Sequence, residues 1–209
     1  EPLAQLVDHS LVVAEPVADS VRYRLLEPVR EFAMTLPGAG SDDVRRRHLR
    51  WCQDLTTELT SAFILRSDAT AFDRVEAEWA NVEAALADSS SALEALRLAI
   101  GLTWYWNLRG HIATGRAHLE RLLATEVGDD AIRGRALTAV ARFALNQDDP
   151  DTAESALVRS IELLHRAGDV EGLIWAYVFE TIAAIANDDA DRAMRAATAA
   201  VAVADGLQG

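Results

Sequence analysis

Apolar residues recur every three or four positions through most of the chain from residue 41 onward. The clearest stripe comprises Phe72, Val75, Trp79, Val82 and Leu86, with successive spacings of 3, 4, 3 and 4. This spacing places one apolar face along a helix. Short polar breaks separate the stripes, so the pattern predicts a series of amphipathic helices. They cover residues 41–65, 68–88, 91–108, 112–125, 131–146, 150–166, 170–186 and 190–205.

The first 36 residues have a different pattern. Residues 3–7 have helical spacing, residues 10–14 become β-branched, and residues 21–25 alternate apolar side chains with Arg. The polar stretch 15–20 between the last two segments predicts a turn, and hence a β-hairpin. Pro28 then favours the first turn of a short helix. This order of elements is typical of the last part of a winged-helix domain.

The helical part contains an internal repeat. Residues 146–153 match residues 186–193 at a distance of 40, and Gly115 corresponds to Ala153 at a distance of 38. Small residues recur at Gly115, Ala153 and Ala193, where two helices must approach closely. A single helix pair cannot bury its apolar face, so the pairs must stack. We therefore expect an all-α fold, a right-handed α-α superhelix of tetratricopeptide-like helix pairs, with a small N-terminal β-hairpin from a truncated winged helix.

Composition narrows the possible functions. Ala occupies 39 of the 209 positions, and the 20 basic residues are all Arg, so chemistry that needs Lys is excluded within these residues. The single cysteine, Cys52, excludes an intrachain disulfide. The formal net charge is −13, with −3 in residues 1–60 and −10 in residues 61–209, which argues against direct DNA binding. The sequence shows neither a signal peptide nor a membrane span, so we expect a cytoplasmic segment of a longer protein with no membrane contact.

Two sets of residues that contain histidine are candidate metal ligands. His48 and Cys52 are four residues apart on a predicted helix and could supply two ligands from one face. His111 and His118 lie seven residues apart with Glu120 nearby. The first set has no third ligand nearby, and the second is better interpreted as a turn residue and a packing residue, so we expect no bound metal.

Paired carboxylates precede several predicted helices, at residues 129–130, 148–149 and 188–189. Such pairs can serve acid–base chemistry or calcium binding. At a helix start, a carboxylate also accepts the free backbone N–H groups and favours the positive end of the helix dipole. Because the pairs recur with the repeat, capping is the preferred interpretation, and we expect no catalytic residues and no enzyme activity in this chain.

The inner face of the predicted superhelix is the candidate binding site. Trp106 falls at a core position, so Trp104, two residues earlier, should face the concave groove. Arg and Trp are favoured at binding hot spots, and Asn can hold an extended backbone. By the same helical register, the groove residues are Arg97, Trp104, Asn107, Arg135, Arg142, Asn146 and Trp175. We expect a protein or peptide partner, or a small effector, in this groove.

Several segments resemble a known family. Residues 6–12 followed by 23–33 resemble the end of the winged-helix part of NB-ARC-type (STAND) signal-transduction ATPases, especially bacterial transcriptional regulators of the LuxR and AfsR kind. Residues 45–48 and 76–86 resemble the helical linker of these proteins. Residues 104–123 and the units after them resemble their tetratricopeptide-like sensor region.

The resemblance implies a domain organisation and a function. Residues 1–37 correspond to the C-terminal part of a winged-helix domain, 38–90 to a helical linker region and 91–209 to tetratricopeptide-like repeats. The family carries ATP or ADP in a module upstream of this segment, and it contacts DNA through a separate module, so no cofactor is expected here. The basic concentration around residues 45–50 would then face the ATPase module. The implied function is protein interaction and effector sensing in transcription regulation and signal transduction.

Other interpretations stay open from the sequence. A general tetratricopeptide scaffold would bind a partner without any switching role. A helical enzyme domain would carry a metal or cofactor. An apolar surface at residues 1–36 could also allow a homodimer.

Overall fold

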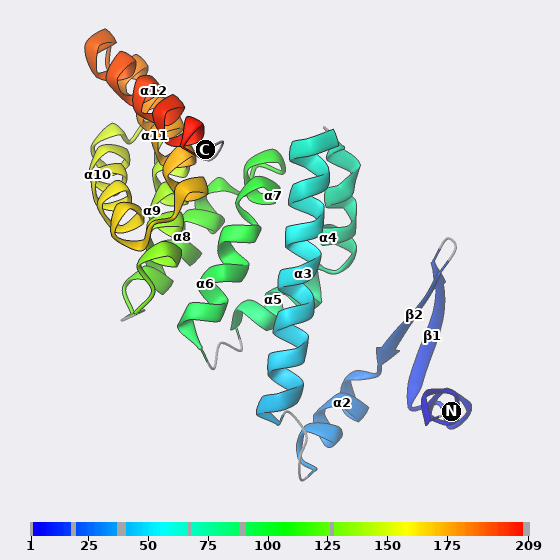
Figure 1. Cartoon of the computed structure of the whole chain (residues 1–209). Helices are drawn as coiled ribbons and strands as arrows, with labels where there is room; N and C mark the ends of the chain where they lie inside the picture. The colour runs from blue at the N-terminus through cyan, green and yellow to red at the C-terminus, as the bar shows by residue number, and fades with distance from the viewer. Residues whose placement is uncertain are drawn as a thin grey trace. The chain divides into compact units, whose positions relative to one another are not determined.

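The computed structural model describes residues 2–17, 20–36, 41–66, 68–87, 91–125 and 128–206. Its contacts divide the chain into two compact units, an N-terminal unit, Glu1–Arg46, and a helical unit, Arg47–Gly209. The long helix α3 (Asp42–Arg66) runs across this division (Figure 1). Each unit is described by itself.

The N-terminal unit is a helix, a hairpin and a second helix. Its elements are α1 (Pro2–Asp8), β1 (Val12–Val17), β2 (Ser20–Leu25) and α2 (Glu27–Met34). The strands are antiparallel, with Val12 paired to Leu25 and Val17 to Ser20. The predicted hairpin is therefore confirmed, but the predicted turn at 15–20 is too long. Glu15 to Val17 continue β1, because the hairpin pairing extends to Val17 opposite Ser20.

The N-terminal unit has little core of its own. Among its described side chains, Val12 is the one buried hydrophobic residue. Large apolar side chains are instead exposed on α1, β2 and α2 and in the segments next to them. They are Leu3, Leu6, Leu11, Val21, Tyr23, Leu25, Leu26, Phe32, Met34 and Leu36. Because burial of apolar area drives folding, this unit obtains little stabilisation from its own interior.

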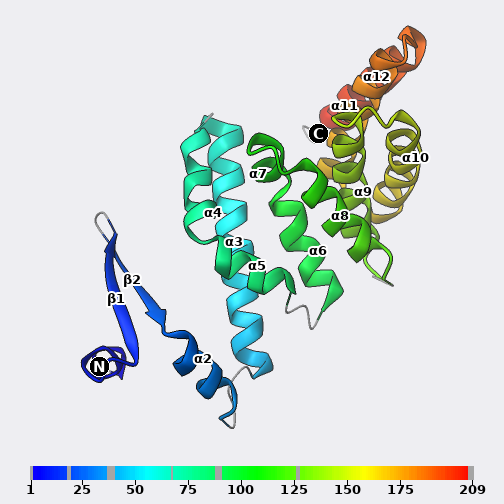
Figure 2. The ribbon, with the colours of Figure 1, turned by 180° about the vertical axis from the view of Figure 1, so that it is seen from behind.

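The helical unit consists of successive helix pairs, as Figures 1 and 2 show. The helix α9 packs along α10, and α11 packs along α12. The elements after α3 are η1 (Ala69–Phe72), α4 (Asp73–Ala77), α5 (Trp79–Ala87), α6 (Ala92–Gly101), α7 (Thr103–Leu108), α8 (Ile112–Leu123), α9 (Asp130–Leu145), α10 (Pro150–Ala167), α11 (Val170–Ala186) and α12 (Ala190–Asp205). The expectation of a mostly helical fold with a small N-terminal hairpin is confirmed.

Two of the predicted helices are interrupted. The segment after residue 68 begins as a 3-10 turn and breaks again at Glu78, after which Trp79 stacks on Tyr105 at 5.5 Å. The segment 91–108 breaks at Leu102, between α6 and α7. There the Thr60 hydroxyl of α3 donates to the Gly101 carbonyl oxygen at 3.1 Å. A side-chain donor to a helix carbonyl competes with the helix's own hydrogen bonding.

The repeated turns have the same conformation in both copies. Asp148 and Asp188 have positive φ values of 54° and 55°. The next residue, Asp149 or Asp189, accepts a hydrogen bond from the backbone N–H three positions later. Asp129 caps α9 in the same way through the N–H of Ile132. The capping interpretation of these carboxylates is confirmed.

The core of the helical unit lies between the paired helices. Trp106 is fully buried, as predicted, and Leu119 and Leu157 are fully buried in the same core cluster. Gly115 lies where α8 approaches α7, and a Cβ atom there would lie 2.6 Å from the Trp106 ring. A larger residue would therefore push the two helices apart. In the part of the chain that the structure describes, no helix is long and apolar enough to span a membrane.

Candidate functional site

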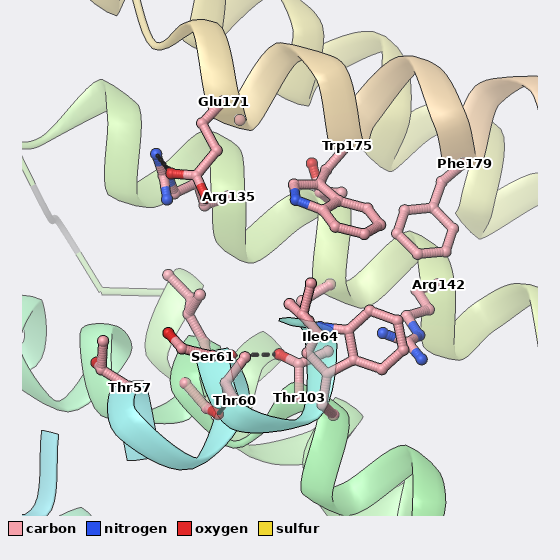
Figure 3. Close-up of a pocket in the computed structure, with 16 residues that line it drawn as sticks. Thr57, Thr60, Ser61, Ile64, Thr103, Arg135, Arg142, Glu171, Trp175 and Phe179 are labelled. Atoms are coloured by element: carbon pink, nitrogen blue, oxygen red, sulfur yellow. Dashed lines mark hydrogen bonds and ion pairs between the residues drawn. The ribbon is translucent and has the colours of Figure 1, made fainter. Parts of the chain in front are cut away.

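A pocket of about 330 Å³ lies in the helical unit, between α3, α6, α7, α9 and α11 (Figure 3). The first helices of successive pairs form its walls, and α8, α10 and α12 contribute nothing to them. The lining residues are Thr57, Thr60, Ser61, Ile64, Ile100, Gly101, Thr103, Trp104, Arg135, Thr138, Ala139, Arg142, Glu171, Gly172, Trp175 and Phe179. The volume is at the lower end of the range for small-molecule sites.

Close packing of α3 against α6 shapes one side of the pocket. A Cβ atom on Gly101 would lie 2.5 Å from the Thr56 hydroxyl oxygen, so only glycine allows this approach. The break that follows at Leu102 reorients the chain, and Thr103 and Trp104 at the start of α7 line the pocket. Residues on both sides of the interruption between α6 and α7 therefore line the pocket.

Three aromatic side chains form one end of the pocket, which we call the aromatic wall: Trp104, Trp175 and Phe179. The rings of Trp104 and Trp175 meet edge to face at 5.9 Å, and Trp175 stacks on Phe179 at 6.3 Å. These distances are in the range of favourable aromatic contacts. Phe63 of α3 supports Trp104 from its other side at 5.3 Å.

Arg142 of α9 lies against the aromatic wall and is almost completely buried. Only 7% of the residue is exposed. Its guanidinium carbon is 3.6 Å from the centroid of the Trp104 ring and 5.5 Å from that of Phe179. Among the described residues, no carboxylate and no hydrogen-bond acceptor contacts the guanidinium.

The charge of Arg142 survives this burial. Burial lowers the pKa of the Arg142 guanidinium to about 10, because the charged form loses hydration. A group with this pKa is still almost fully protonated at neutral pH. The aromatic wall therefore holds a cation that carries no carboxylate partner within the described chain.

Arg135, also on α9, is fully paired at the opposite end of the pocket. Its Nε and Nη2 atoms donate to the two Asp169 oxygens at 2.5 and 2.7 Å, and Nη2 also donates to Glu171 at 3.0 Å. Hydrogen bonding by Asp169 raises the pKa of Arg135, and Arg135 in turn lowers the pKa of Asp169. Asp169 also caps α11 through the Gly172 N–H at 3.1 Å. This cluster joins α9 to the start of α11.

The other predicted groove residues do not line the pocket. Arg97 pairs with Glu94 at 3.7 Å and with the capping Asp129 at 3.4 Å. The amide of Asn146 donates to the Asn107 side-chain oxygen at 2.6 Å, so these two residues bond to each other. The structure thus brings together four of the seven predicted residues, Trp104, Arg135, Arg142 and Trp175.

Three of the five hydroxyl groups among the lining residues are engaged in hydrogen bonds. Thr60 and Thr103 donate to the backbone carbonyls of Gly101 and Ile100, at 3.1 and 2.7 Å. Thr138 shares a 2.8 Å hydrogen bond with Ser160. The described residues that line the pocket include no histidine or cysteine. These hydroxyls stabilise the local backbone and have no neighbouring base that would make them nucleophiles.

Sequence reasoning missed the wall formed by α3. Thr57, Thr60, Ser61 and Ile64 have the three- and four-residue spacing of one helix face, but that face is not apolar enough to stand out. Phe179 was missed as well, although it lies one turn after Trp175. The three-and-four spacing was the available signal in both cases.

The candidate metal ligands, His48 with Cys52 and His118, make other contacts in the structure. The Cys52 Sγ atom lies 3.8 Å from His48 Nε2, and burial raises the pKa of the thiol to about 11. His118 stacks on Trp106 at 5.8 Å. Within the described ranges, no group of three His, Cys, Asp or Glu residues could hold a metal ion.

Two arginines of the N-terminal unit are paired with carboxylates of the same unit. Arg24 pairs with Glu15 at 2.9 Å, and Arg30 pairs with Glu27 at 2.8 Å. Both pairs are exposed, so each contributes little stability.

The chain is similar to part of mycobacterial transcriptional regulators. It is 34% identical over 149 residues, 66% of its length, to proteins named "Putative HTH-type transcriptional regulator" in Mycobacterium tuberculosis and Mycobacterium bovis. The match covers 16% of those proteins, so the chain spans a small part of the length of these relatives. No family model matches the chain. The similarity relates the chain to transcriptional regulators.

Proposed function

We propose that this chain is the effector-sensing and protein-interaction region of a transcriptional regulator and that it is not catalytic. The observation that carries the proposal is the buried cation of Arg142, unpaired among the described residues and held against the aromatic wall in a pocket. An isolated buried charge is costly to the fold. A bound ligand that supplies the missing partner offsets this cost and gives the residue a role.

The position of the pocket supports a sensing role. Its walls come from α3, from α6 and α7, from α9 and from α11, so a ligand there contacts several helix pairs at once. A ligand shifts a conformational equilibrium by its difference in affinity for the two states. A ligand that touches several pairs favours the arrangement in which all of its contacts are made, and the signal then passes to the rest of the regulator.

The finer assignment rests on the resemblance to NB-ARC-type regulators of the LuxR and AfsR kind. In this proposal, residues 1–37 are the end of the winged-helix domain, and the helices of 38–90 couple it to the repeats. ATP or ADP, and the contact with DNA, belong to modules outside these residues. The chain acts in the cytoplasm, with no membrane contact.

Transcript measurements test the sensing role. In the gene that encodes the chain, Arg142→Gln is compared with Arg159→Gln, which removes the same charge from an exposed position on α10. We expect Arg142→Gln to change a reproducible set of transcripts and Arg159→Gln to leave them unchanged. Both proteins must be present at the wild-type level, as measured by immunoblot. Identical transcripts for both variants would contradict the proposal.

A scaffold without a switch is the second candidate function, because helix-pair repeats support binding as well as sensing. In such a scaffold, transcripts would change only as far as the Arg142→Gln substitution weakens the binding of the protein partner. Co-purification of the partner with the wild type and with the Arg142→Gln variant separates the two functions.

A further inference from the structure

We propose that the pocket binds a small organic monocarboxylate with a flat, apolar body. Its carboxylate pairs with the Arg142 guanidinium, and its body lies against the aromatic wall. The inference rests on the proposed function, because it names the chemical class of the effector.

The first argument is the state of the guanidinium. Stacking on Trp104 at 3.6 Å covers one face of the group, but its N–H donors lie in the plane of the group, at its edge. In the described chain, the fully buried side-chain atoms without a hydrogen-bond partner belong to residues other than Arg142. Its nitrogen atoms therefore keep access to the pocket, where a carboxylate can accept two parallel hydrogen bonds.

The second argument is the count of charges. Among the residues that the structure describes, Arg135 and Arg142 are the two cations that line the pocket, and Glu171 is the one lining carboxylate. Arg135 is occupied by Asp169 and Glu171. One cation is left for a ligand, which matches a single negative charge. A phosphate monoester brings about 1.5 to 2 charges, and the second cation it would require is already engaged.

The third argument is size and shape. A volume of about 330 Å³ suits a small molecule. Trp175 and Phe179 lie on one side of Arg142, as Figure 3 shows, and Trp104 stacks on its guanidinium. A flat ring placed beside the cation meets aromatic faces and edges, which favour ring contacts. These features select an aromatic or similarly planar acid.

Calorimetry with matched probes tests the proposal on the purified chain. The acids are indole-3-acetate, phenylacetate and benzoate, and indole-3-acetamide is the neutral counterpart of the first. We expect at least one acid to bind once per chain with a millimolar or lower dissociation constant, which is ordinary for ligands of this size. The amide should bind at least about tenfold more weakly than indole-3-acetate, because it lacks the charge-assisted pair.

Variants locate the binding. In Arg142→Gln, the acid should lose about tenfold or more in affinity, and the acid and amide should then bind alike. Arg142→Lys, which keeps the cation without the planar fork, should retain part of the preference for the acid. Arg159→Gln should bind as the wild type does. Circular dichroism and thermal unfolding of each variant establish that it is folded.

Several results would overturn the proposal. They are no binding of any acid at about 10 mM, equal affinity for acid and amide, unchanged affinity in a folded Arg142→Gln variant, or tighter binding of phenyl phosphate than of phenylacetate. The transcript measurement distinguishes a failure of the proposed ligand class from a failure of the proposed sensing role. If the acids fail to bind but Arg142→Gln still changes transcripts, the ligand class is wrong and the sensing role survives. If the acids bind through Arg142 but transcripts do not change, the sensing role is wrong.

Discussion

An arginine lies at each end of the pocket, but one arginine is paired with carboxylates and the other is not. Arg135 and Arg142 lie on one face of α9, about two turns apart. Arg135 forms hydrogen bonds with two carboxylates, and this pairing raises its pKa. Arg142 is nearly buried against aromatic rings, and burial lowers its pKa. One end is electrostatically complete, and the other has an unmatched charge within the described chain.

The difference shows that a residue's role depends on what the neighbouring element places opposite it. Asp169, which pairs with Arg135, is the N-cap residue of α11, and its position therefore follows from the start of that helix. Opposite Arg142, the same helix presents Phe179. Arg135 therefore contributes to the packing of α9 against α11, whereas Arg142 is kept for a ligand in our proposal.

The largest expected effect is at the paired end. Arg135→Met leaves the Asp169 carboxylate, with 10% of its side chain exposed, without its cation. We expect the free energy of unfolding in urea to fall by about 1–3 kcal/mol, less than for a fully buried pair because Arg135 is partly exposed. The control, Arg166→Met, breaks an exposed pair with Asp130. This variant should change the free energy of unfolding by less than about 0.5 kcal/mol. Equal losses in the two variants would contradict a special role for the Arg135 cluster.

Acid should reduce the contribution of the Arg135–Asp169 pair to the free energy of unfolding. Arg135 holds the pKa of Asp169 below its ordinary value of 3.8 in the folded state. The resulting stabilisation is complete above the unfolded-state pKa and is lost as the pH falls through the lower, folded-state pKa. Between about pH 6 and about pH 3, wild type should therefore lose more stability than Arg135→Met, and Arg142→Met should follow wild type. Urea unfolding at each pH measures this. Parallel curves for wild type and Arg135→Met would contradict the prediction.

The stacking of Arg142 on Trp104 should appear as an interaction energy. A double-mutant cycle of Trp104→Leu and Arg142→Met measures it, with each protein unfolded in urea. We expect a coupling of about 1 kcal/mol, the magnitude typical of a partly desolvated cation–π contact. A coupling near zero would mean that the guanidinium does not rest on the ring in solution.

The smallest effect is expected from Arg142→Met alone. Removing a buried cation relieves its desolvation, which offsets the lost stacking on Trp104. The free energy of unfolding should therefore rise or stay within about 1 kcal/mol of wild type. A loss above about 2 kcal/mol would show that Arg142 stabilises the fold as Arg135 does, and the comparison between the two ends would fail.

Much of the fold was predictable because its signals are local. The helical spacing and the capping residues Asp149 and Asp189 lie in the sequence itself, and the structure confirms both. The interruptions at Glu78 and Leu102 were not predicted. Beside the break at Leu102, the Gly101 carbonyl oxygen accepts a hydrogen bond from the Thr60 hydroxyl of a distant helix, a contact that no local pattern reveals.

The candidate site was predictable only in part. Helical register placed Trp104, Arg142 and Trp175 on one face, and they line the pocket, whereas Arg97 and Asn107 lie outside it. Register cannot tell which arginine acquires a carboxylate partner, because that partner comes from another helix. The contribution of α3 was missed because its segment was assigned to a linker. The role of these residues in binding stays a prediction.

The most direct test of the unmatched charge is nuclear magnetic resonance of the arginine side chains. The chain is labelled with ¹⁵N-arginine and titrated with indole-3-acetate, and the Nε–Hε signals of Arg135 and Arg142 are assigned from the Arg135→Met and Arg142→Gln variants. We predict that the Arg142 signal shifts progressively with added acid while the Arg135 signal stays in place. A titration in which the Arg142 signal does not move, or in which both signals move alike, would contradict the account.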